Sequence, residues 1–390
     1  MGNPVRAAGG ELLTDNSALQ IREMAKELVT LSAQQNTLAT LTMAAAVKVK
    51  NQYEFEMMYL PARPNIVTVE AVNASTLQFT AAELPWVQVG MHLLKDADTR
   101  ARVTAVDYTA GTYQVTIDAT AASYGIAAAT VLNLGAPGSA EGSAAPTPMT
   151  RVPDTVTQHI STIRCAYGLS RHAMSSANYS GARMLQNRKE CMQFMKESIE
   201  RAGWVDAKAK VTGPPLLYKS GSLPYVATAA GNVLTLEDSV VSLGGLRQVV
   251  RLAGRYMPSK DLLFFVSPKG SEMLDRINLE KAVPTKREDI PSLGLSCTTY
   301  GFGRHNLKVY EVDQLAGGGM ENEMYLLDPA GLAAATTKDQ ESGRRNWMLE
   351  ETDAQTPGTD GKLGVFTCDF GLDLVPAWCW RIKGAANYRV

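Results

Sequence analysis

Residues 181–204, GARMLQNRKECMQFMKESIERAGW, constrain the fold of this 390-residue chain most, because they have the clear periodicity of a long helix. The expected apolar stripe contains Met184, Cys191, Met192, Met195, Ile199 and Ala202. The expected polar face contains Lys189, Gln193, Lys196, Glu197 and Glu200. Opposite charges four residues apart add only about 0.2–0.5 kcal/mol per pair. We therefore expect packing of the stripe to hold this helix, with Gly203 as its stop signal.

Arg188 interrupts the apolar stripe of this helix. A guanidinium that is buried without a partner is costly, so Arg188 needs either water or a carboxylate. Two interpretations are open. The side chain snorkels to solvent along a half-covered helix, or it forms a salt bridge to another element or to another subunit.

Residues 66–134 have a different character, with six short runs of strand type separated by turn residues. Val103, Ala105 and Asp107 alternate before the connection TAGT, and Tyr113, Val115 and Ile117 alternate after it, which is typical of a hairpin. These runs predict a small antiparallel barrel or sandwich. The small, Pro- and Gly-rich residues 135–148 that follow predict a linker or a mobile loop.

The pattern of residues 238–333 predicts an α/β region. We expect a helix containing Leu243, Leu246, Val249, Val250 and Ala253, a strand at 261–266, and a second helix that Ser267 caps. Arg247, Arg251 and Arg255 form a row opposite the apolar face of the first helix. The row is either a solvated helix face or a surface for an acidic neighbour or for nucleic acid.

No arrangement of catalytic or ligand-binding residues stands out in the sequence. The four histidines lie in different expected segments and lack metal-binding spacing. The five cysteines are scattered and never spaced as CxxC, which indicates neither a disulfide framework nor a zinc site. We therefore expect no enzymatic activity, no catalytic residue, no cofactor and no metal.

Charge and hydropathy narrow the class of protein further. Lys and Arg number 38 against 39 Asp and Glu, which argues against a strongly basic nucleic-acid-binding protein. The N-terminus has no signal-peptide core, and no run approaches the ~20 apolar residues of a membrane span. Residues 17–47 begin with helical spacing and continue into a Thr- and Ala-rich stretch, which indicates an arm rather than a domain.

The order of these segments from about residue 40 to 390 resembles the major capsid proteins of tailed bacteriophages, which have the Hong Kong 97-type fold. Residues 175–204 resemble the spine helix of that fold. DLLFFVSPKGSEMLDRI, followed by TTYGFGRHNLKVYEVDQL, is similar to the axial domain. NEMYLLDPAGLAAA and DFGLDLVPAWCWRI resemble the later axial strand and the final peripheral strand.

The resemblance implies an α+β chain with a definite division. The expected parts are an N-terminal arm at 1–60, an extended-loop region at 61–150 with a β-barrel-like insertion at about 66–134, a return strand and peripheral domain at 151–237 with the spine helix at 175–204, an axial domain at 238–333, and return strands of the peripheral domain at 334–390. The insertion and the lack of a long N-terminal scaffolding helix depart from the prototype, and no cross-linking Lys or Asn is carried over.

The function implied by the resemblance is structural. The chain would self-assemble into pentamers and hexamers of an icosahedral phage head around double-stranded DNA. This assembly would take place in the host bacterial cytoplasm. Its partners would be copies of itself, packaged DNA held without sequence specificity, and scaffolding, portal and decoration proteins, with no membrane. The alternatives are an encapsulin-like compartment shell and a hydrolase with a β accessory domain. Arg188, Arg247, Arg251 and Arg255 are the residues expected to face another subunit or DNA.

Overall fold

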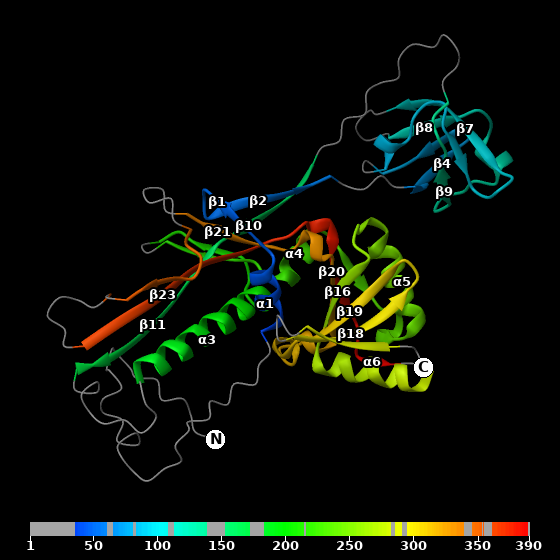
Figure 1. Cartoon of the computed structure of the whole chain (residues 1–390). Coiled ribbons are helices and arrows are strands. Elements are labelled where there is room, and N and C mark those ends of the chain that lie inside the picture. Colours follow the sequence, from blue (N-terminus) through cyan, green and yellow to red (C-terminus); the bar gives the residue numbers. More distant parts are fainter. Residues whose placement is uncertain are drawn as a thin grey trace. The chain divides into compact units, whose positions relative to one another are not determined.

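A computed structural model of the chain, drawn in Figure 1, divides it into two compact units, Leu60–Asp154 and the remainder of the chain. Residues 1–35 of the expected arm, residues 172–182 before the long helix and most of the expected linker lie outside the described residues. The described residues are 36–60, 65–80, 83–107, 113–138, 153–171, 183–213, 216–281, 285–290, 295–338, 345–352, 354 and 361–388.

The predicted long helix is confirmed as α3 (Arg183–Trp204), which packs along a sheet of long strands (Figure 1). In that sheet β11 (Ser161–Ser170) pairs antiparallel with β23 (Gly361–Asp373) over ten residue pairs. The order continues from β23 to β21 (Ala333–Thr337) and then to β1 (Ala46–Lys50), and β22 (Leu349–Glu351) also pairs with β23.

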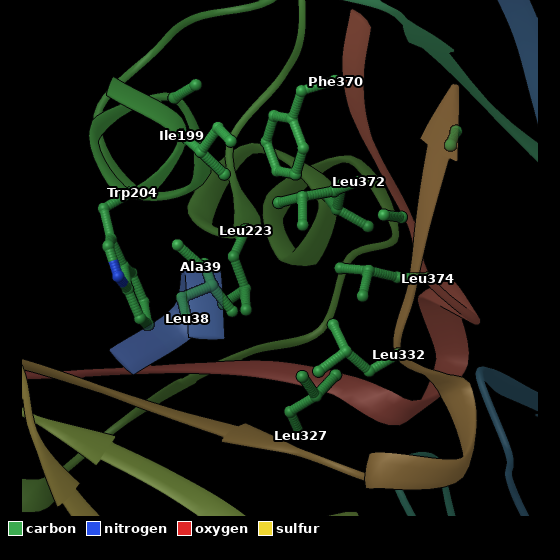
Figure 2. Packing of buried hydrophobic residues seen from close by; sticks show 14 of the residues in the cluster. Leu38, Ala39, Ile199, Trp204, Leu223, Leu327, Leu332, Phe370, Leu372 and Leu374 are labelled. Carbon is green, nitrogen blue, oxygen red and sulfur yellow. The ribbon is translucent and has the colours of Figure 1, made fainter. Parts of the chain in front are cut away.

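A short helix that the sequence did not predict, α1 (Thr37–Ala44), packs against the last turns of α3. Leu38 and Ala39 of α1 are buried beside Trp204 and Leu223, as Figure 2 shows. β1 follows α1 and pairs in parallel with β21. Residues 36–50 of the expected arm therefore pack into the body of their own chain.

Two further strands of this unit form a ribbon. β2 (Glu54–Tyr59) and β10 (Asp154–His159) form a two-stranded sheet with each other. Phe55 and Met57 of β2 are buried in the same core as α3. A hairpin of β12 (Ala209–Val211) and β13 (Leu217–Lys219) and the helix α4 (Leu223–Ala229) follow α3.

Five strands of the α/β region join β14 (Val233–Thr235) and β24 (Cys379–Lys383), which lie outside residues 238–333, in a seven-stranded mixed sheet with a second core. Its order is β14, β24, β20 (Glu323–Leu327), β16 (Asp261–Val266), β19 (His305–Glu311), β18 (Leu295–Phe302) and β17 (Thr285–Ile290). β15 (Val240–Val241) pairs with β25 (Asn387–Tyr388).

Both faces of the central strand β16 are buried, because its side chains alternate between two cores. Leu263 and Phe265 join the core that contains α3, whereas Phe264 and Val266 join the second core. The second core also contains side chains of α5 (Leu243–Ala253) and α6 (Pro268–Lys281). Both helices and this strand confirm the sequence prediction. The cap is confirmed as well, since the Ser267 hydroxyl accepts a hydrogen bond from Gly270 N at 3.0 Å.

The second unit is an all-antiparallel sheet with a core of its own. Its order is β3 (Ile66–Thr68), β9 (Val131–Leu134), β6 (His92–Leu94), β7 (Arg100–Asp107), β8 (Gln114–Ile117), β5 (Thr76–Gln78) and β4 (Ala71–Asn73).

The predicted hairpin is present as β7 and β8, but one detail of its predicted alternation is wrong. The pairing shifts between Val103 and Ala105, which is the signature of a β-bulge. Ala105 is exposed as a result, and Val106 instead of Ala105 lies opposite Val115.

Candidate assembly surfaces

Arg188 of α3 forms a salt bridge with Glu350 of β22. Its Nε donates to Glu350 Oε1 and its Nη2 to Glu350 Oε2, both at 2.6 Å. The guanidinium also lies 5.8 Å from the ring centroid of Phe366, and the Tyr167 hydroxyl donates to the same carboxylate. The hydrogen bonds from Arg188 lower the pKa of Glu350 from its ordinary value of 4.5 to about 2. Of the two interpretations of Arg188, the structure favours the salt bridge, made to another element of the same chain.

Glu200 corrects the prediction for the polar face of α3. Its side chain is fully buried, although helical spacing had placed it on the solvated face with Lys196. The carboxylate accepts from Leu38 N at 3.1 Å, from Ala39 N at 2.6 Å and from the Trp204 indole Nε1 at 2.7 Å. Burial raises the pKa of Glu200, because desolvation outweighs these three donors.

The geometry of α1 explains this burial. Leu38 and Ala39 are in the first turn of α1, where backbone N–H groups have no acceptor within the helix. Glu200 supplies that acceptor from a different helix, and no side chain of α1 itself caps this end. α1 covers the face of α3 at its last turns only, so the same face is exposed toward the N-terminal half of α3.

The base of the ribbon is held by aromatic and charged side chains. The Tyr218 ring of β13 stacks on Tyr53 at 5.7 Å between centroids and meets His159 edge-on at 5.3 Å. Lys210 Nζ of β12 lies 3.1 Å from the carboxylate of Glu54 in β2, and this contact lowers the pKa of Glu54. The hairpin β12/β13 therefore contacts both strands of the ribbon.

The ribbon and the hairpin also expose apolar side chains. Met58 of β2 is 64% exposed, and Val211, Leu216 and Leu217 are exposed at the hairpin. Val211 pairs with Leu217, so these two exposed side chains are adjacent, and adjacent apolar side chains on a surface are typical of sites that contact another protein.

The predicted row of arginines lies on the outer face of α5, where Arg247 and Arg251 are exposed and Leu246 and Val250 are buried on the opposite face. Arg255 follows in a short turn, with its guanidinium 5.6 Å from the ring of Tyr256. The structure does not bring this row together with Arg188, because α3 and α5 contribute to different cores.

A pocket of about 250 Å³ lies beside α5. Its lining includes Leu234, Asp238, Ser242, Gln248 and Leu252. Among the described residues no group of three or more His, Cys, Asp or Glu side chains could hold a metal ion. Within the same part of the chain, no helix combines the length and apolar character needed to cross a bilayer.

No protein-family model matches the chain, and no curated protein matches its sequence. Solved structures with a similar arrangement include the capsid of a native GTA particle, with 10% identity, a TM-score of 0.45 and coverage of 97% of this chain and all of the other. A structure from Mycobacterium phage Adephagia has 11% identity and a TM-score of 0.43, with 96% of each chain covered. The holo-SrpI encapsulin complex from Synechococcus elongatus has 10% identity and a TM-score of 0.45, and the match covers 62% of this chain and 80% of that one.

Proposed function

We propose that this chain is the major capsid protein of a tailed bacteriophage and that it self-assembles into pentamers and hexamers of an icosahedral shell around double-stranded DNA. The observation that carries the proposal is the ribbon β2/β10, which is anchored in the core of one unit, together with the separately packed β unit that lies between its two strands in the sequence. A shell protein needs no active site, because its activity is repeated self-association.

Both strands of the ribbon are anchored in the core by buried side chains. Phe55 and Met57 fix one face of β2 in the core, and the Gln158 side chain of β10 is buried and hydrogen-bonded to both N and O of Gly221. The opposite face of β2 is exposed at Glu56 and Met58. A ribbon of two strands is marginally stable in water unless other surfaces cover it. In the proposed shell, a neighbouring subunit covers this exposed face.

The helix α3 suits a rigid strut in such a wall. Cys191, Met195 and Ile199 pack one face against the chain's own sheets, whereas Phe194 and Leu185 are exposed on other faces. Neighbouring copies would bury these side chains, and their burial would stabilise the subunits in a concentration-dependent way.

The proposal is tested by expressing the full chain and examining it by negative-stain electron microscopy and sedimentation. Hollow particles or rings of capsomers are expected. A compact monomer at high concentration would refute the proposal. Extraction of nuclease-protected double-stranded DNA from particles made during infection separates the phage head from an encapsulin-like compartment, whose contents would be protein.

We further propose that the β unit clasps neighbouring capsomers. The structure allows a clean deletion, because Ile66 pairs with Asn133 and Leu134 N donates to Asn65 O at 2.8 Å. Removal of residues 66–134 therefore leaves two adjacent ends that a short Gly-Ser linker can join. The deletion is expected to abolish shells and to leave the circular dichroism of the remaining unit intact. Normal particles from the deleted chain would instead identify the unit as a surface decoration.

The arginine row on α5 is proposed to face an acidic neighbour or packaged DNA. Replacement of Arg247, Arg251 and Arg255 by Gln keeps a polar, hydrogen-bonding side chain at each position and removes three charges. Assembly or DNA retention that depends on salt in the wild type should lose that dependence in the triple variant. Equal salt responses of the two proteins would contradict both roles.

A further inference from the structure

The helix α5 presents two different features to solvent. One is the pocket of about 250 Å³, and the residues of α5 that line it are Gly245, Gln248, Val249 and Leu252. The other is the pair Arg247 and Arg251, which are exposed and do not belong to the lining of the pocket. At about 100° per residue, the two arginines lie about 130° around the helix from the centre of the lining residues. The pocket and the arginine pair are therefore on different sides of α5.

The pocket suits a side chain that has an aliphatic stem and a cationic end. Its apolar lining includes Leu234 and Leu252, and its carboxylate is that of Asp238. Gln248 adds an amide oxygen that can accept a further hydrogen bond. Arginine matches this combination, because its stem packs on apolar surface and its guanidinium has five N–H donors. An anionic ligand would meet the Asp238 carboxylate, so the charge of the pocket argues against one.

The turn that carries Asp238 is fixed by its surroundings. Asp238 and Ser239 both have a φ of 55°, in the left-handed region that residues other than glycine rarely adopt. Ser239 N donates to Leu236 O at 3.3 Å, and Ser239 O accepts from Ala386 N at 3.2 Å. Because these bonds hold the turn on both sides, Asp238 is positioned before any ligand arrives, which lowers the entropic cost of binding.

A second copy of the chain is the occupant that fits both features. The arginine pair cannot enter the pocket of its own chain, because the two features lie on different sides of one helix. An interface between two unlike surfaces of identical chains is heterologous, and heterologous interfaces form rings where the rotation closes. The pentamers and hexamers proposed above are such rings, so the inference rests on the proposed function and names a contact within its capsomers.

We propose that the pocket beside α5 is a binding site for the arginine pair Arg247 and Arg251 of the adjacent copy in a capsomer ring. One guanidinium enters the pocket, pairs with Asp238 and donates to Gln248, while its stem packs on Leu252. The second guanidinium lies one helical turn away and adds its charge to the same attraction. Each subunit supplies one arginine pair and receives one, so every pocket of a closed ring is filled.

The test reverses the charge on each side of the contact in the full chain. One variant is Asp238→Lys, and the other combines Arg247→Glu with Arg251→Glu. Each alone places like charges in every contact of the ring, so the concentration at which rings or shells form should rise at least about tenfold in sedimentation and negative-stain microscopy. Lys269→Glu, at an exposed position of α6, is the control and should assemble as the wild type does.

An equimolar mixture of the two variants identifies the pairing. If the variants alternate around a ring, every pocket again meets side chains of opposite charge, so the mixture should recover assembly near the wild-type concentration. Strict alternation needs an even number of subunits, and the recovered rings should therefore be hexamers without pentamers.

The outcomes separate this inference from the proposed function. A wild type that forms rings, together with an Asp238→Lys variant that assembles equally well, would overturn the inference and leave the proposed function standing. A mixture that fails to recover assembly would show that the pocket meets a different cationic group, and it would overturn the inference too. A wild type that stays monomeric would refute both.

A neutral variant covers the case in which Asp238→Lys does not fold, as judged by circular dichroism. Asn tolerates the left-handed region, so Asp238→Asn keeps the turn and removes the charge. It should weaken assembly and make it less sensitive to salt than that of the wild type. Assembly equal to the wild type at every salt concentration would overturn the inference.

Discussion

Replacement of Glu200 by Gln tests the contact between α1 and α3 most directly. The carboxylate has two oxygens that accept from three donors, Leu38 N, Ala39 N and the Trp204 indole. Gln keeps the shape of the side chain but has one oxygen and one NH₂ group. Wherever the amide points, its NH₂ group faces at least one N–H donor and leaves that donor without an acceptor.

The expected loss of stability follows from these contacts. Hydrogen bonds to a charged group are worth about 1.5–3 kcal/mol each, and an unsatisfied buried donor costs about 1–3 kcal/mol. The raised pKa of Glu200 shows that desolvation of its charge outweighs these hydrogen bonds, so Gln removes that cost, and the loss that remains comes from the stranded donor. We therefore expect Glu200→Gln to lower the free energy of unfolding by about 1–3 kcal/mol, and Glu200→Ala, which strands all three donors, by about 3–5 kcal/mol.

The measurement combines urea unfolding, followed by circular dichroism of the unassembled chain, with hydrogen exchange of the peptide that contains Leu38 and Ala39. Faster exchange is expected at these two amides in Glu200→Gln, because they are the groups that lose an acceptor. Glu197→Gln is the matched control, since Glu197 lies one turn earlier and pairs with Arg201 at 3.7 Å on the half-exposed side. Wild-type protection of both amides in Glu200→Gln, with a midpoint equal to that of the control, would refute the reasoning.

Three further predictions follow from other contacts. The Glu350 pKa of about 2 is depressed from 4.5, so its contribution to stability is present above pH 4.5 and is lost as pH falls toward 2; Glu350→Gln should remove this part of the pH dependence in urea titrations, and an unchanged slope would contradict it. In Gly203→Ala the new Cβ would lie 2.5 Å from Leu38 Cδ2, so the substitution should destabilise the wild type. In a Leu38→Ala background the clash is absent, and the same substitution should stabilise the protein by up to ~1 kcal/mol in the same titrations. A change of the same sign in both backgrounds would argue against a clash. Ser267→Ala should cost about 1 kcal/mol through loss of the α6 cap, and no loss would show that another group caps this end.

Periodicity predicted the elements whose identity is local. The stripe of α3, the apolar positions of α5 and the cap at Ser267 each depend on residues within a few turns of one another, and the structure has all three. The hairpin β7/β8 was likewise visible from its alternation. The bulge between Val103 and Ala105 was not, because one extra residue in one strand leaves no pattern in the sequence.

The residues that the sequence misplaced depend on partners far along the chain. α1 has little helical periodicity of its own, and its N-terminal acceptor comes from Glu200, about 160 positions later. A helical wheel cannot show that α1 covers only the last turns of α3, so Glu200 was assigned to water. The interruption at Arg188 did predict the need for a carboxylate, but nothing local identifies Glu350 as that carboxylate.

These long-range polar contacts have a common physical role. Apolar burial is non-directional, so the stripe of α3 could slide along β11 and β23 with little loss of buried area. A bidentate pair such as Arg188–Glu350 has one favourable geometry, and the Glu200 carboxylate meets its three donors in one position only. Breaking either contact leaves a charge or a donor unsatisfied, which makes neighbouring registers costly. The apolar core therefore supplies most of the stability of α3. The Glu350 carboxylate fixes the position of α3 along the sheet, and the Glu200 carboxylate fixes its contact with α1.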